Sequence, residues 1–183
     1  MEFEEAIRTA PDNAEAQEGL GVALTRLKEY EEAIKIYENA LSNNIDPIRR
    51  SRLLLGLAEA QRGAKLWEEA INSLRRAVSA DSESMEAANQ LAWMMATAPR
   101  AEWRNTVEAL EAGERAGKRE DAPSVHLDTL AAVYADAGRW DEAVHTAEKA
   151  IEKAKSEGNE NLAEEFRSRL ELYRQKKPYH QDE

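Results

Sequence analysis

The sequence predicts an all-α fold: a right-handed α-α superhelix of about four helical repeats, with an orphan N-terminal helix and a C-terminal capping helix. Three nearly identical segments carry this prediction, namely Tyr30-Glu-Glu-Ala-Ile34, Trp67-Glu-Glu-Ala-Ile71 and Trp140-Asp-Glu-Ala-Val144. Each has a second alanine seven residues after its first. Self-similarity at a period in the thirties is typical of a repeat solenoid.

The composition suits closely packed helices. Apolar residues make up 42% of the chain and aromatic residues only 6%, so most of the apolar material is alanine and leucine. Five prolines and eight glycines leave few breaks between long helical stretches.

The first repeat occupies residues 14–47. Its first helix carries Leu20 and Gly21, and its second carries Tyr37 between two alanines. Small residues let two antiparallel helices approach to ~8–10 Å, and the leucine and tyrosine fill the space beside the contact. This spacing of Leu-Gly, alanine, aromatic and alanine resembles the tetratricopeptide repeat, a helix-turn-helix unit of about 34 residues.

The next three repeats follow the same pattern less evenly. In the second repeat, residues 48–83, the turn is about two residues longer, and Gly63 is expected to end the first helix. The third, residues 84–122, is the least regular, because its turn is long and Gly113 stands where a large residue is expected. The fourth, residues 123–157, is close to the pattern.

The last segment, residues 158–183, is predicted to be a capping helix and a tail. Apolar residues recur at three- and four-residue spacing along one face, opposite a charged face, as a solenoid end requires: Leu162, Phe166, Leu170 and Tyr173. The later part of the chain also resembles the C-terminal segment of bacterial multi-repeat tetratricopeptide proteins, through Gln90–Thr97, Leu127–Gly138, Leu170–Arg174 and Pro178-Tyr179.

The first 13 residues match the second half of a repeat. Phe3, Ala6 and Ile7 would form the apolar face of a helix whose partner is missing. We therefore expect the chain to be the C-terminal part of a longer array, with a short natural cap as the alternative. An unpartnered apolar face also favours association, so a homo-oligomer through this helix is a further expectation.

Charge and residue usage exclude several classes of function. The net charge of -11 disfavours binding to nucleic acid and to anionic membrane surfaces. No segment approaches the ~20 apolar residues that span a bilayer, so we expect a soluble chain, cytoplasmic or periplasmic in a bacterium. The chain has no cysteine, its three histidines lack ligand spacing, and adjacent carboxylates on a helix do not converge. We expect no enzyme activity, no metal and no cofactor.

The family resemblance implies a binding surface. In tetratricopeptide proteins the first helices of successive repeats line a concave groove, and fixed motif positions face it. Mapped onto this sequence, the groove residues that we expect to contact a partner are Glu15, Glu18, Val22, Arg26, Leu53, Leu57, Gln61, Glu86, Asn89, Trp93, Asp128 and Asp136.

The composition of this groove suggests a kind of partner. Leu53, Leu57 and Trp93 make its middle apolar, whereas Glu15, Glu18, Asp128 and Asp136 make its ends acidic. This pattern suits a protein or peptide with apolar anchors and basic flanks. Trp93 is the expected hot spot, although it could instead pack between neighbouring helices. Glu18 and Val22 replace the cationic clamp of the family's chaperone-tail readers, so acidic tails should not bind.

Three functions are consistent with the sequence. The first is a protein–protein interaction scaffold. The second is a non-catalytic repeat domain of a larger, possibly membrane-anchored bacterial enzyme such as a glycosyltransferase. The third is a self-assembling structural module. The sequence also leaves open whether a partner or another part of the same chain fills the groove.

Overall fold

A computed structural model of the chain describes residues 14–182. These residues form helices joined by turns and contain no strand, which confirms the all-helical repeat fold. The predicted half repeat with Phe3, Ala6 and Ile7 lies outside the described residues. The chain divides into two compact units, one ending at Ala87 and the other beginning at Ala88.

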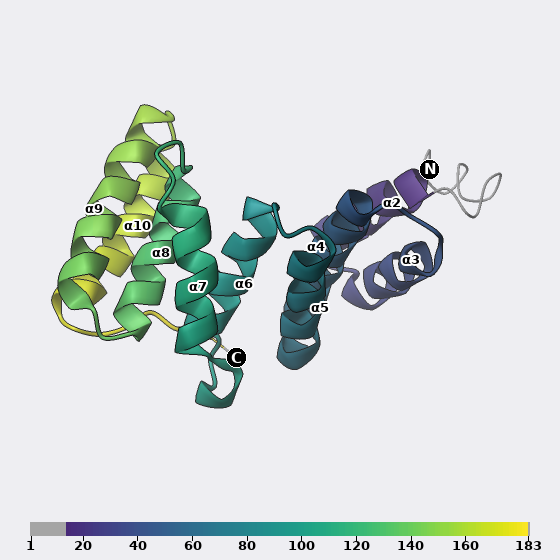
Figure 1. Cartoon of the computed structure of the whole chain (residues 1–183), viewed down its shortest axis with the longest axis horizontal. Coiled ribbons are helices and arrows are strands. Elements are labelled where there is room, and N and C mark those ends of the chain that lie inside the picture. Colours follow the sequence, from purple (N-terminus) through teal and green to yellow (C-terminus); the bar gives the residue numbers. More distant parts are fainter. Residues whose placement is uncertain (1–13, 183) are drawn as a thin grey trace. The chain divides into compact units, whose positions relative to one another are not determined.

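The first unit is a stack of two helical hairpins (Figure 1). Its helices are α2 (Ala14–Arg26), α3 (Tyr30–Ser42), α4 (Pro47–Gly63) and α5 (Trp67–Ala80). Each helix packs on the next along the chain, and α2 also packs on α4. The first helices of the two repeats are therefore neighbours, the arrangement from which a groove in this unit is built.

The core of the first unit is centred on Tyr37. The tyrosine ring is 1% exposed, and it packs against the backbone of Gly21 on α2 and of Gly56 on α4. A Cβ at Gly21 would lie 2.6 Å from the ring, and one at Gly56 would lie 2.5 Å from it. The Leu-Gly pair of each first helix is thus a seat for the aromatic side chain of α3.

The helix-turn-helix junctions close in a common way. After α2 and α4, Lys28 and Lys65 adopt positive φ angles of 65° and 63°, which turns the chain back within three residues. The prediction for Gly63 is right about the helix end and incomplete about its reason. Helix α4 does end there, but Lys65 takes the left-handed conformation, and the missing side chain of Gly63 makes room for the Tyr30 ring.

The second unit continues the repeat pattern (Figure 1). Helix α6 (Met85–Thr97) runs into it and is followed by a short 3-10 turn, Ala101–Trp103, in the long connection that the sequence indicated. Helices α7 (Thr106–Gly117), α8 (Ser124–Asp136), α9 (Trp140–Ser156) and α10 (Glu160–Arg174) complete it. Consecutive helices from α7 to α10 pack on one another, and α8 also contacts α10.

The core of the second unit confirms the predicted cap. Phe166, Leu170 and Tyr173 of α10 are buried, and Leu162 is partly buried beside them. They pack against the small residues of α9, which are fully buried: Ala143, Ala147, Ala150 and Ala154. Alanines on one helix and large residues on the other let the last two helices approach closely.

Candidate partner-binding surfaces

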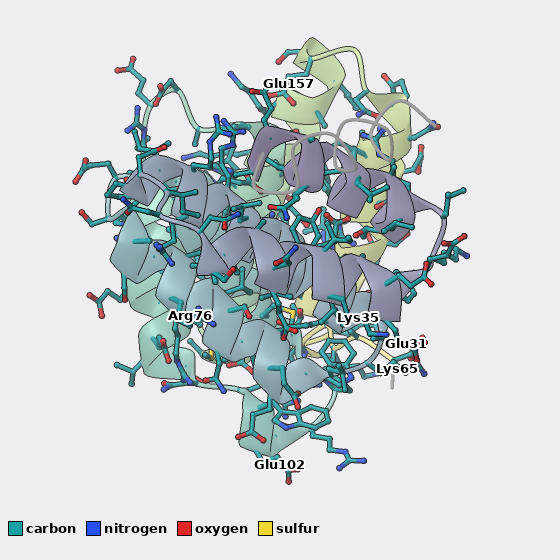
Figure 2. The ribbon with its side chains drawn as sticks, turned by 90° about the vertical axis from the view of Figure 1, so that its right-hand side faces the viewer. Glu31, Lys35, Lys65, Arg76, Glu102 and Glu157 are labelled. Atoms are coloured by element: carbon teal, nitrogen blue, oxygen red, sulfur yellow. The ribbon has the colours of Figure 1, made fainter. Side chains whose placement is uncertain are left out.

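The groove residues predicted for the first repeat lie together. Glu15, Glu18, Val22 and Arg26 of α2 line one hollow of about 450 Å³, and Arg52 of α4 closes its side. Val22 is 39% exposed, so an apolar side chain is available to a partner there. The charged side chains that Figure 2 labels on α3 and α5, Glu31, Lys35 and Arg76, are exposed and extend from the ribbon.

Arg52 is the residue of this hollow that the sequence reasoning missed. Its guanidinium holds the Glu18 carboxylate through two nitrogens, with Nε–Oε1 at 3.0 Å and Nη2–Oε2 at 2.7 Å. The hydrogen bond to Glu18 raises the pKa of Arg52 above its ordinary value. A signal was present, because Arg52 lies 34 residues after Glu18, one repeat period along the chain.

The groove residues predicted for the second repeat are in the core. Leu53 and Leu57 are 0% and 2% exposed, and Gln61 is buried and accepts a hydrogen bond of 2.7 Å from the Ser73 hydroxyl of α5. The reason is the central place of α4 in this unit. Because α2, α3 and α5 all pack on α4, Leu53 and Leu57, four residues apart on one face, lie in the core, whereas Arg52 is exposed.

The residues predicted on α6 have different environments. Glu86, in its first turn, is exposed, whereas Asn89 is only 8% exposed. Trp93 is half-buried, and its ring lies 5.7 Å from that of Tyr179 in the C-terminal tail. Trp93 therefore has a partner within the same chain, and that partner comes from the end of the sequence.

Asp128 of α8 is bound by Arg169 of α10. The carboxylate accepts from Nε at 3.0 Å and from Nη2 at 2.8 Å, and it is buried. Burial raises the pKa of Asp128, and the guanidinium opposes that shift. The same guanidinium lies over three aromatic rings, with centroid distances of 5.4 Å to Trp93, 5.3 Å to Phe166 and 5.5 Å to Tyr179.

Asp136, at the end of α8, is also engaged within the second unit. Its Oδ2 accepts a hydrogen bond of 2.8 Å from the Thr106 hydroxyl, and its Oδ1 lies 3.7 Å from Nε of Arg104. His180 of the tail faces the same oxygen, with Nε2 at 3.7 Å. The structure thus brings Trp93, Asp128 and Asp136 to one surface of the second unit, and the C-terminal tail covers it.

A third surface has no counterpart in the sequence prediction. A hollow of about 510 Å³ lies between the end of α7, α8 and α9, with Leu127 and Leu130 among its apolar lining. Several cations surround it, Lys118, Arg119, Lys149 and Lys153, and the His145 side chain lies among them. Lys118 and Arg119 are paired with Glu114 and Asp121, at 2.9 Å and 3.0 Å.

Two further findings concern the described residues alone. Between residues 14 and 182, no group of three or more His, Asp or Glu side chains is arranged to hold a metal ion. Within the same range, every helix is too short or too polar to cross a bilayer.

Comparison with known proteins identifies the repeat. Models of the tetratricopeptide repeat match residues 2–47, 30–81 and 125–156, which together make up more than half of the chain. The protein belongs to the tetratricopeptide repeat family. A comparison with curated proteins returned no match.

Solved structures of the same fold agree with this assignment. MamA is 20% identical with a TM-score of 0.66, and the match covers 85% of this chain and 86% of MamA. YrrB, described as a tetratricopeptide protein with an unusual peptide-binding site, is 18% identical with a TM-score of 0.66, covering 95% and 88%. TTC0263, a protein of Thermus thermophilus, is 21% identical with a TM-score of 0.67, covering 94% and 87%.

These relationships define the class of protein. The chain is a helical repeat module of the kind that generally mediates interactions between proteins. The comparisons give no support to the alternative of an accessory domain of a glycosyltransferase.

Proposed function

We propose that the chain is an interaction scaffold that binds a peptide segment in the hollow between α2 and α4. One observation carries the proposal: the residues predicted for the first repeat, Glu15, Glu18, Val22 and Arg26, line a single hollow. A surface that is concave, that offers an apolar side chain and that has charges at its rim is suited to an extended or helical segment.

The chemistry of the hollow defines the partner. Val22 offers contact to one apolar anchor, and Glu15 and Glu18 attract basic flanks. Arg52 already pairs with Glu18, so a basic side chain of the partner competes with it for the carboxylate. We infer a partner with one apolar anchor next to lysine or arginine, in line with the pattern read from the sequence.

A peptide selection tests this proposal. Random peptides displayed on phage are selected for binding to the full chain. Fluorescence anisotropy then measures the affinity of the selected peptides for the parent protein and for the variants Val22→Asn and Val107→Asn. Val107 is the matched control, because it is an exposed valine on α7 of the second unit. Removing the apolar contact should weaken binding about tenfold for Val22→Asn, and Val107→Asn should bind like the parent.

Two results would oppose the proposal. One is equal binding by both variants, which would move the site away from α2. The other is a selection that yields acidic peptides, which would show that Arg26 and Arg52, rather than Glu15 and Glu18, attract the partner.

A further inference from the structure

The C-terminal tail, Pro178–Gln181, returns across the second unit. After α10 the chain turns at Lys176, whose φ is 55°, and the tail then reaches Trp93 and Thr97 of α6. Of the helices that it reaches, α6 and α8 are the first helices of their hairpins, and α10 is the capping helix. The tail therefore lies where the repeat pattern expects a partner.

The first recognition element is aromatic. Tyr179 packs beside Trp93 with ring centroids 5.7 Å apart, and Arg169 lies over both rings. Asp128 fixes the Arg169 guanidinium by two hydrogen bonds, so the cation is already in place whichever aromatic ring arrives. This surface is built to receive one aromatic side chain.

The second element is a pair of hydrogen bonds at the end of α6. The Gln181 backbone N–H donates to the carbonyl of Thr97 at 2.7 Å, which is one of the acceptors that a helix C-terminus leaves unpaired. The Gln181 side-chain amide donates to the Thr97 hydroxyl, also at 2.7 Å, and that hydroxyl in turn donates to the Trp93 carbonyl. Thr97 thus accepts hydrogen bonds from both the backbone and the side chain of Gln181.

Few hydrogen bonds and few buried contacts hold the tail in place. Among the residues that the structure describes, the one backbone hydrogen bond that holds it beyond the turn ending α10 is that of Gln181, and His180 and Tyr179 remain half-buried. Segments with few buried contacts and few backbone hydrogen bonds open locally at low free-energy cost. A segment of the same chemistry on another protein can therefore compete for the surface.

We propose that Trp93, Thr97, Asp136 and Arg169 form a binding site for an extended peptide with an aromatic residue two positions before a glutamine, and that the chain's own tail is its resident, displaceable occupant. We call this surface the tail site. The inference deepens the proposed function and rests on it in one respect, since it treats the second unit as a peptide receptor.

The test uses the tail itself as probe. A labelled synthetic peptide with the sequence of residues 176–183 is titrated, up to about 1 mM, into the full chain and into a chain ending at Lys177. A tethered tail acts at an effective concentration of the order of millimolar, so it should weaken the free peptide's binding to the full chain at least tenfold. We expect the shortened chain to bind, and peptides carrying Tyr179→Ala or Gln181→Ala to bind at least tenfold more weakly.

A second variant keeps the whole chain. The full-length double variant Tyr179→Ala, Gln181→Ala loses both recognition elements of its own tail and should bind the probe like the shortened chain. Asp182→Asn is its matched control, because Asp182 is exposed at the end of the same tail, and it should exclude the probe as the parent does.

The outcomes separate the tail site from a structural staple. If a helical shortened chain and the double variant both fail to bind the probe, the tail only braces the fold and the proposal is overturned. If the shortened chain unfolds, the double variant alone decides. Val22→Asn in the shortened chain should bind the probe unchanged, so failure at the tail site and failure at the α2 hollow are distinguishable.

Discussion

Arg52 lies one repeat period after Glu18, and the two side chains form a two-pronged ion pair between α2 and α4. Helices α2 and α4 are the first helices of successive repeats and pack on one another, so side chains about one repeat period apart meet across them. It also lowers the free negative charge of the hollow, because Glu18 is neutralised by its own neighbour. If a peptide binds in the hollow, as proposed, the pair should therefore limit the attraction of its basic side chains.

Replacing the arginine should expose that charge. Arg52→Gln is expected to change the free energy of unfolding by less than about 1 kcal/mol, since the pair is half-exposed. Affinity for a peptide with basic flanks should rise severalfold at low salt, and the gain should shrink at high salt. The measurement is anisotropy at two salt concentrations, with Arg76→Gln on α5 as the control. An unchanged or reduced affinity would contradict the role given to Glu18.

The close packing of Tyr37 against Gly56 predicts that a side chain at position 56 destabilises the protein. In Gly56→Ala the new Cβ would lie 2.5 Å from a ring that is enclosed on both sides. The strain should outweigh the ~1 kcal/mol that alanine gains in a helix, for a net loss of roughly 1–3 kcal/mol. Urea unfolding measures this loss, and Tyr37→Leu in the same background should recover part of it. A variant as stable as the parent would show that the Tyr37 ring is not tightly packed against Gly56.

The alanine positions make a similar prediction for the second repeat. Ala70 of α5 is fully buried, and Ala70→Leu should cost roughly 1–3 kcal/mol by overpacking. Asn72→Leu is the control, because Asn72 is exposed on the same helix and should change stability by less than about 0.5 kcal/mol. A melting curve for Ala70→Leu that coincides with the parent's would place α5 in a different register.

Alkaline pH should weaken the first unit through Tyr37. Burial raises the pKa of Tyr37 to about 12 from its usual 10.0. Above pH 10 the unfolded chain loses this proton before the folded chain does, so the stability that the group contributes is lost as pH rises from 10 towards 12. The resulting loss in the free energy of unfolding reaches about 2 kcal/mol as the pH approaches 12. Urea unfolding at several alkaline pH values should show a shallower decline for Tyr37→Phe.

The repeat pattern predicted most of the fold because packing repeats with the sequence. The alanines at 33, 70 and 143 and the apolar stripe of α10 are buried as expected, since small-on-large contact is set locally within each hairpin. The exposure of the groove positions in the second repeat could not be predicted in the same way. Helix α4 is packed by α2, α3 and α5 together, so Leu53 and Leu57 lie in the core, and the repeat spacing alone does not say how many helices pack on one element.

The repeat pattern of the sequence could not predict the tail site. Thr97 and Gln181 are 84 residues apart and belong to no common repeat, so no periodicity relates them. In the sequence, Pro178 and Tyr179 indicate only a family resemblance and give no sign of a contact with α6. The sequence leaves open whether the groove is filled from within the chain, and this contact provides a candidate occupant for the second unit.

We expect His180 to make docking of the tail sensitive to pH. Burial of the ring lowers the pKa of His180, and the nearby Arg104 adds to this effect, whereas Asp136 on the same side opposes it. The docked imidazole therefore binds a proton less readily than the free tail, whose pKa is near 6.5. The His180 contribution to the free energy of docking is fully present above that value and is lost as pH falls through it.

The labelled tail peptide should bind the shortened chain more weakly at about pH 5.5 than at about pH 7.5, and a peptide with His180→Gln should bind equally at both. Tighter binding in acid would mean that Asp136, rather than burial and Arg104, controls the ring.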